Sequence, residues 1–167
     1  MTRSTFRILG PAGIIERAAL ALAERARARR EHRTTGAEDV PVRDIMTRSI
    51  VCAHPDLPVA ALLGVMIGER LGCVPVVNED DQPIGMVTKL DVVEHLVASP
   101  PPPDALVRDL MMPLAITLDD DASVAHAATL MAGEDMHHVM IVSGRRLVGI
   151  VSTMDVTRWI AEHGKPA

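Results

Sequence analysis

Residues 42–46, Val-Arg-Asp-Ile-Met, recur 65 positions later as residues 107–111, Val-Arg-Asp-Leu-Met. The two copies continue in parallel and end on matching closing stretches, Gly-Met-Val-Thr-x-x-Asp-Val at residues 85–92 and Gly-Ile-Val-Ser-x-x-Asp-Val at residues 149–156. Chance does not produce a colinear series of this kind, so the chain is an internal duplication.

Each copy predicts the same order of secondary structure, β-α-β-β-α. An extended segment is followed by turn residues and an apolar helix, and then by a hairpin of two β-rich runs and a closing helix. In the first copy these elements are expected at residues 49–53, 58–69, 73–77, 83–88 and 90–98. In the second copy they are expected at residues 115–118, 123–134, 138–142, 146–151 and 154–163. The predicted fold class is α/β (α+β).

The predicted organisation consists of a basic N-terminal helical extension, two repeats and a Pro-rich linker between them. The boundaries are expected at residues 1–40 for the extension, 41–98 for the first repeat, 99–104 for the linker and 105–163 for the second repeat. A repeat of about sixty residues buries its sheet poorly by itself, so we expect the copies to pack about a pseudo-twofold axis. Two equivalent clefts would then lie where the copies meet, and small ligands usually bind in such clefts.

The composition limits the classes of function. The chain has 167 residues, a formal net charge of −5 and no apolar run long enough to span a membrane. Its beginning has no apolar signal segment, so we expect a cytoplasmic protein, and Cys52 and Cys73 lack C-x-x-C spacing, so we expect no disulfide framework or zinc knuckle. The two thiols are either redox-sensitive or, as is more common, buried as small hydrophobic groups. Aromatic residues make up only 1% of the chain, which argues against stacking on nucleic-acid bases.

Charge is distributed unevenly along the chain. Residues 1–35 contain eight arginines and three glutamates, a net charge of +5, whereas residues 36–167 sum to −10. Strong helix formers with one apolar stripe predict an amphipathic helix over residues 14–32. This helix either packs on the acidic body or on a second subunit, or forms a basic arm for nucleic acid or a phosphate-bearing partner. The alternation of Arg with Glu and Ala favours packing.

Each closing stretch places a hydroxyl at the end of a strand and a carboxylate in the first turn of the next helix. The pairs are Thr88 with Asp91 and Ser152 with Asp155. A single S/T-x-x-D spacing is most simply a capping box. The same geometry suits a nucleotide, because a helix N-terminus favours phosphate and a carboxylate can accept hydrogen bonds from ribose hydroxyls. Two matched copies favour a pair of nucleotide sites, with the upstream glycines allowing a ligand to approach the strand.

Together these motifs resemble the cystathionine-β-synthase (CBS) domain, and the tandem resembles a CBS pair, or Bateman module. The resemblance covers about residues 42–163 and rests on the two Val-Arg-Asp openings, the run Cys73-Val-Pro-Val-Val77 and the two closing stretches. It implies a regulatory module that binds adenosine derivatives such as AMP, ADP, ATP, S-adenosylmethionine or NAD(H). It also implies ribose contacts to the two motif aspartates, with the motif hydroxyls beside the ribose or phosphate. Adenine would lie against the extended segments, at Ile50, Val51, Cys52, Ala115, Ile116 and Thr117.

Some positions depart from the family pattern. Many members have an arginine directly before the motif aspartate, where this chain has Leu90 and Met154, with Lys89 one step earlier. Met140 replaces the proline of the second hairpin. His137 and His138 are adjacent on a strand and must face opposite ways. Both are most simply partly exposed histidines; alternatively one lines a cleft and meets a phosphate, and His137 is a candidate for that role.

No other constellation predicts chemistry. The triplet at residues 119–121, Asp-Asp-Asp, is interpreted as a polar turn, and we expect no metal site. No nucleophile–base arrangement, metalloprotease motif or P-loop occurs, so we expect no enzyme and no required cofactor.

Two hypotheses follow. The favoured one is a stand-alone sensor of adenosyl nucleotides, which we expect to be a homodimer. The alternative is an interaction adaptor with degenerate clefts, whose Arg-rich N-terminal helix docks a partner protein, with nucleic acid as a less favoured partner.

Overall fold

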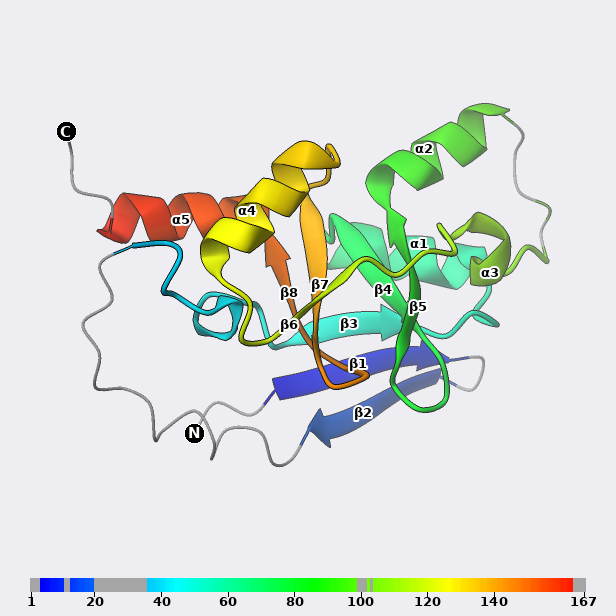
Figure 1. Ribbon diagram of the computed structural model, residues 1–167. Helices are drawn as coiled ribbons and strands as arrows, with labels where there is room; N and C mark the ends of the chain where they lie inside the picture. The colour runs from blue at the N-terminus through cyan, green and yellow to red at the C-terminus, as the bar shows by residue number, and fades with distance from the viewer. Residues whose placement is uncertain (1–3, 11–12, 20–35, 99–101, 103, 164–167) are drawn as a thin grey trace. The chain divides into compact units, whose positions relative to one another are not determined.

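The computed structural model describes residues 4–10, 13–19, 36–98, 102 and 104–163 (Figure 1). These residues fall into two compact units. The Asp91 unit contains Val51–Ile116 together with most of strands β1 (Ser4–Gly10) and β2 (Gly13–Ala19). The Asp155 unit contains residues 36–50 and the chain from Thr117 onward.

The Asp91 unit is built on a sheet with the strand order β2-β1-β3-β4-β5. Strand β3 (Ile50–Ala53) pairs parallel with β4 (Cys73–Val77), which pairs antiparallel with β5 (Pro83–Thr88). Its helices are α1 (Val59–Gly68), α2 (Lys89–Ala98) and α3 (Val107–Leu110). Aliphatic side chains from one sheet face, α1 and α3 make its core: Val51, Ala53, Leu57, Leu62, Met66, Val74, Val76, Val87 and Val107.

The Asp155 unit repeats this plan with the strand order β6-β7-β8. Strand β6 (Thr117–Asp119) pairs parallel with β7 (His138–Ser143), which pairs antiparallel with β8 (Arg146–Ser152). Its helices are α4 (Val124–Gly133), α5 (Thr153–His163) and the short 3-10 helix Val42–Asp44. Trp159 of α5 packs against the edge of the core and stacks on His163, with ring centroids 5.4 Å apart.

The predicted order β-α-β-β-α is confirmed in both copies, with element ends shifted by a few residues. Two expectations are wrong. The first copy's sheet is not limited to its own three strands, because β1 and β2 extend it. The helix predicted over residues 14–32 is a strand at Gly13–Ala19, and residues 20–35 lie outside the described chain. Pairing in a sheet overrides helix propensity here, and the adjacent Ile14 and Ile15 favour a strand.

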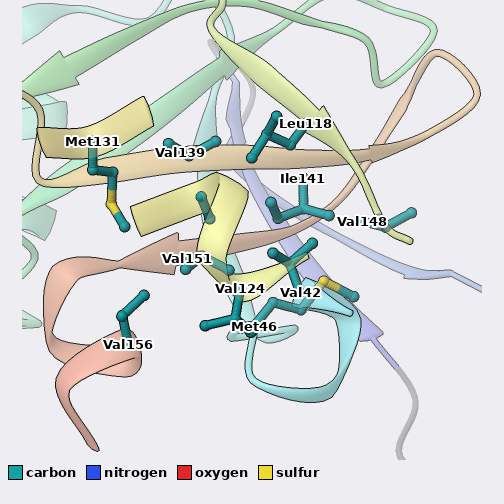
Figure 2. Packing of buried hydrophobic residues seen from close by; sticks show 11 residues of the cluster. Val42, Met46, Leu118, Val124, Met131, Val139, Ile141, Val148, Val151 and Val156 are labelled. Carbon is teal, nitrogen blue, oxygen red and sulfur yellow. The ribbon is translucent and has the colours of Figure 1, made fainter. Parts of the chain in front are cut away.

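The Val-Arg-Asp opening of each repeat packs in the unit that contains the other repeat. In the Asp155 unit, Val42 N–H donates to the carbonyl of Ala122 (2.7 Å) and Val124 N–H donates to the carbonyl of Val40 (2.8 Å). In the Asp91 unit, Val107 N–H donates to the carbonyl of Leu57 (2.9 Å) in the equivalent way. Figure 2 shows Val42 and Met46 among core side chains of α4 and the sheet. The sequence repeats and the compact units therefore do not coincide, and the openings are exchanged.

The glycine that begins each closing stretch is where the exchanged segment meets the sheet. A Cβ on Gly85 would collide with the backbone carbonyl of Met112, whose N–H and carbonyl pair with Met86. A Cβ on Gly149 would instead collide with the side chain of Met46. The expectation that these glycines admit a ligand is therefore wrong, because protein atoms already occupy the space above both.

We predict that Gly85→Ala lowers the free energy of unfolding more than Gly149→Ala, about 2–4 against about 1 kcal/mol. A backbone carbonyl fixed in a strand pair cannot retreat, whereas the flexible end of the Met46 side chain can. Urea unfolding followed by circular dichroism measures both. Gly64→Ala, in an open position inside α1, is the control and should stabilise by about 0.5–1 kcal/mol. Equal losses for the two motif glycines would contradict this account.

Candidate functional site

The candidate site in the Asp91 unit is the corner where β5 ends and α2 begins. The Asp91 carboxylate oxygen Oδ2 accepts hydrogen bonds from the backbone N–H and the hydroxyl of Thr88, at 2.6 and 2.7 Å. In return, Asp91 N–H donates to the Thr88 hydroxyl at 3.2 Å. This is a complete capping box at the start of a ten-residue helix.

The corner in the Asp155 unit has the same geometry. The Asp155 oxygen Oδ2 accepts from the N–H and hydroxyl of Ser152 at 2.8 and 2.6 Å, and Asp155 N–H donates back to the hydroxyl at 3.2 Å. The second carboxylate oxygen, Oδ1, forms an ion pair with Nη1 of Arg158 at 3.2 Å. The Asp155 side chain is 12% exposed, whereas that of Arg158 is 61% exposed.

Strand register places the motif hydroxyls on the sheet face opposite each core. In the Asp155 unit, Val139 pairs with Val151 in the core, so the neighbouring pair, His138 with Ser152, faces the other way. Thr117 pairs with Met140 and shares this outer face. In the Asp91 unit the equivalent outer face has the pair Cys73 and Thr88, joined by Cys52 from β3. Each corner therefore adjoins a strip of side chains without Phe, Tyr or Trp, namely Cys52, Cys73 and Thr88 in one unit and Thr117, His138, Met140 and Ser152 in the other.

His138, and not His137, is the histidine beside the Asp155 corner. Burial lowers the pKa of His138, repulsion from His137 lowers it further, and the nearby Asp155 carboxylate acts in the opposite direction. His137 is exposed, and its carbonyl accepts the N–H of Thr153 at the start of α5 (3.0 Å). Successive side chains of a strand point to opposite faces of the sheet. Because Val139 is buried in the core, His138 lies on the outer face, and this alternation is the sequence signal that could have distinguished His138 from His137.

Both cysteines are protonated thiols at physiological pH. Burial, with smaller contributions from Asp81 and from the other thiol, raises the pKa of Cys52 to about 12, and burial raises that of Cys73 to about 12. Thiols that stay protonated are poor nucleophiles and poor metal ligands. Among the described residues, no three His, Cys, Asp or Glu side chains gather to hold a metal ion.

The structure divides the predicted site residues between the units. The Asp91 unit holds one set: Thr88, Lys89, Asp91, Val51, Cys52, Ala115 and Ile116. The Asp155 unit holds the others: Ser152, Asp155, Thr117, His137 and Ile50. The side chain of Val51 belongs to the core and so can offer a ligand only its backbone. Ala115 and Ile116 precede β6 and are not part of it. Sequence reasoning missed His138 and Arg158, although the Asp-x-x-Arg spacing on a helix favours the ion pair.

Comparison with known proteins identifies the family. The family model of the CBS domain matches residues 42–98 and 107–162, so the chain belongs to the CBS domain family and contains two tandem copies. Proteins with CBS pairs are generally regulatory. Within the described residues, no helix has the length and apolar character that crossing a bilayer requires.

Three similar proteins illustrate the relationship. Hypoxic response protein 1 of Mycobacterium tuberculosis is 30% identical over 122 residues, which cover 72% of this chain and 85% of that protein. An uncharacterised protein of Methanocaldococcus jannaschii, MJ1404, is 30% identical over 143 residues, which cover 78% of this chain but only 34% of the relative. The CBS domain pair of protein MJ0100, solved in complex with 5′-methylthioadenosine and S-adenosyl-L-methionine, has a TM-score of 0.66 and 25% identity, covering 74% of this chain and 97% of that one.

We predict that His138 makes the fold sensitive to mild acid. Because its pKa is lower in the folded chain than the ordinary 6.5, the unfolded chain binds more protons, and stability is lost as the pH falls through and below 6.5. His138→Gln should flatten the dependence of the melting temperature on pH between about pH 7.5 and 5. His126→Gln, at an exposed position of α4, is the control and should keep the slope. An unchanged slope in His138→Gln would show that other groups cause the acid sensitivity.

Proposed function

We propose that the chain is a regulatory module that binds an adenosine-containing nucleotide at the Thr88–Asp91 and Ser152–Asp155 corners. The observation that supports this most directly is the pairing of a hydroxyl with a carboxylate at the N-terminus of α2 and again of α5, with hydroxyl–carboxylate distances of 2.7 and 2.6 Å. Each of the two helices has one such cap, as capping alone would require; the matched strand positions beside both caps are what suits a pair of ligand sites.

The chemistry of the corners suits a nucleoside. In each capping box the Oδ2 oxygen is engaged, which leaves Oδ1 of Asp91 as the acceptor for ribose hydroxyls. Oδ1 of Asp155 is paired with Arg158 at 3.2 Å, so a ribose there would share this oxygen with the guanidinium. The helix N-terminus beside it favours the negative charge of a phosphate. No aromatic ring lies on the outer faces at Cys52, Thr117 and Met140; Cys52 and Met140 are buried and Thr117 is half-buried, so adenine would have to be distinguished mainly by backbone polar atoms.

The candidate ligands are AMP, ADP, ATP, S-adenosylmethionine and NAD(H). The complex of the MJ0100 pair with two adenosine derivatives supports this class. We propose no catalytic step, since the motif carboxylates are engaged in capping and in ligand contact, and the ligand acts as an effector rather than as a required cofactor.

The test is isothermal titration calorimetry with AMP, ATP, S-adenosylmethionine and NADH. We expect saturable binding of at least one, and loss of that binding in the double variant Asp91→Ala with Asp155→Ala, because the ribose acceptors are removed. Each alanine also removes a cap that is worth about 0.5–2 kcal/mol, so melting temperatures must first show that the variants are folded.

Asp109→Ala is the matched control. Asp109 accepts the N–H of Leu106 at 2.9 Å at the start of α3, so its loss removes a cap without touching either corner. It should bind like the unaltered chain. If the double variant of the motif aspartates also binds normally, the site assignment is wrong.

We further propose that the chain is a homodimer joined through α2. Leu90, Val93 and Val97 recur on one face of that helix and are 64%, 55% and 81% exposed. Light scattering after size exclusion should give about twice the 18.0 kDa of the chain. Val93→Glu with Val97→Glu should give the monomer, whereas Met112→Glu, exposed but outside α2, should not. A monomeric unaltered chain would exclude this interface.

The alternative is an adaptor that docks a partner through residues 1–40. The net charge of +5 in residues 1–35 favours it, although residues 13–19 are a strand and not the expected helix. Affinity capture with and without residues 1–40 distinguishes the two functions, because a sensor needs the corners and an adaptor of this kind needs the basic segment.

A further inference from the structure

The two corners share their hydrogen bonds but differ in the residues around them. Equivalent positions are occupied by Cys73 and His138 on the strand beside the hydroxyl, by Lys89 and Thr153 at the first helical residue, and by Glu94 and Arg158 one turn further along the helix. The difference between Glu94 and Arg158 makes the Asp155 corner more cationic, whereas Lys89 adds a cation at the Asp91 corner. His138 adds little charge at neutral pH, because burial lowers its pKa. The formal charge of Lys89, Asp91 and Glu94 is −1, whereas that of Asp155 and Arg158 is zero before any protonation of His138.

Arg158 changes what the motif carboxylate offers. Its Nη1 lies 3.2 Å from Oδ1 of Asp155, the oxygen that the capping box leaves available. In the part of the chain that the structure describes, no cationic side chain pairs with Asp91, and the residue in the place of Arg158 is the exposed Glu94. One motif carboxylate is thus neutralised by a guanidinium, and the other has a second carboxylate one turn away.

The guanidinium is placed to be shared with a ligand. The ion pair with Asp155 holds it near the N-terminal end of α5, yet the Arg158 side chain is 61% exposed. A rotation of the flexible side chain would therefore let the guanidinium replace the carboxylate oxygen of Asp155 by a phosphate oxygen of the ligand. An arginine beside a helix N-terminus is a strong combination for phosphate. At the other corner, Glu94 repels a phosphate, and the single charge of exposed Lys89 offsets only part of the two carboxylates.

We propose that Arg158 makes the Ser152–Asp155 corner selective for adenosine derivatives with a 5′-phosphate, whereas the Thr88–Asp91 corner accepts derivatives with a neutral or cationic 5′ substituent. This proposal rests on the proposed function and assigns different ligands to its two sites. Arg158 acts on specificity through charge, and the ribose contact remains with Asp155.

The experiment compares AMP with 5′-methylthioadenosine, which share adenosine and differ in the charge of the 5′ group. Asp91→Ala leaves only the Asp155 corner competent, and Asp155→Ala leaves only the Asp91 corner. By calorimetry, we expect the first variant to prefer AMP and the second to prefer methylthioadenosine, each by about tenfold or more.

The charge-bearing residues are then exchanged within these backgrounds. Arg158→Gln in the Asp91→Ala chain should weaken AMP about tenfold and leave methylthioadenosine within about twofold. Glu94→Arg in the Asp155→Ala chain should strengthen AMP by a similar factor. Both differences should shrink in about 0.5 M salt, because exposed charges are screened.

The outcomes are distinguishable. If the corners have the same preference, or if Arg158→Gln weakens both ligands equally, this proposal is overturned while the proposed function stands. If neither AMP nor methylthioadenosine binds the unaltered chain, the assignment of ligands to the corners fails outright; if ATP, S-adenosylmethionine and NADH fail as well, so does the proposed function. Should an alanine variant not fold, Arg158→Gln and Glu94→Gln alone in the full chain decide the matter, since both positions are exposed: only Arg158→Gln should reduce the affinity for AMP.

Discussion

The exchange of the Val-Arg-Asp openings is the constraint on which both units depend. Residues 40–47 have their hydrogen-bonding partners at the start of α4 and on the outer strand β8, through Val42, Val124 and the mutual pair of Thr47 with Ile150 (2.9 and 3.1 Å). Residues 105–112 have theirs at the start of α1 and on β5. Each sheet edge next to a closing stretch is thus covered by chain from the opposite repeat, which protects an otherwise unpaired strand. The two sequence repeats are therefore not two units that could fold independently. The contacts that exchange the openings join residues far apart in the sequence, which favours slow, concerted folding.

In the proposed function, helix stability and ligand binding depend on the same few atoms of the two corners. A reciprocal capping box fixes the motif hydroxyl and carboxylate before any ligand arrives, so little ordering is required on binding. The same engagement means that a substitution of the aspartate weakens the helix and the site together. The neighbouring positions that do not cap can change without loss of the capping box, and the two copies differ there, at Cys73 and His138 and at Glu94 and Arg158.

The sequence predicted local structure well and non-local arrangement poorly. The elements from β3 to α5 follow from alternation, turn residues and helical periodicity, which are properties of short windows. The exchange of the openings could not follow from these signals, because the repeats are alike and either copy could supply the partner. The close approach of Met112 to Gly85 and of Met46 to Gly149 joins distant parts of the sequence, so it is known only from the structure.

For the candidate site, the motif residues were predictable from their duplicated spacing, and the capping geometry from the S/T-x-x-D pattern. The sequence favoured His137 as the histidine for a ligand, whereas the structure places His138 beside the Asp155 corner; which sheet face each side chain occupies is fixed only once Val139 is known to be buried. The helix expected over residues 14–32 failed where strand pairing outweighed propensity at Gly13–Ala19.

The stacking of Trp159 on His163 has a practical consequence. The chain contains one tryptophan and no tyrosine, so its near-ultraviolet emission comes from a single indole on α5. That indole is adjacent in sequence to Arg158 and packs against the edge of the core of the Asp155 unit. The fluorescence of the protein therefore reports directly on the surroundings of α5 in the Asp155 unit, next to Arg158.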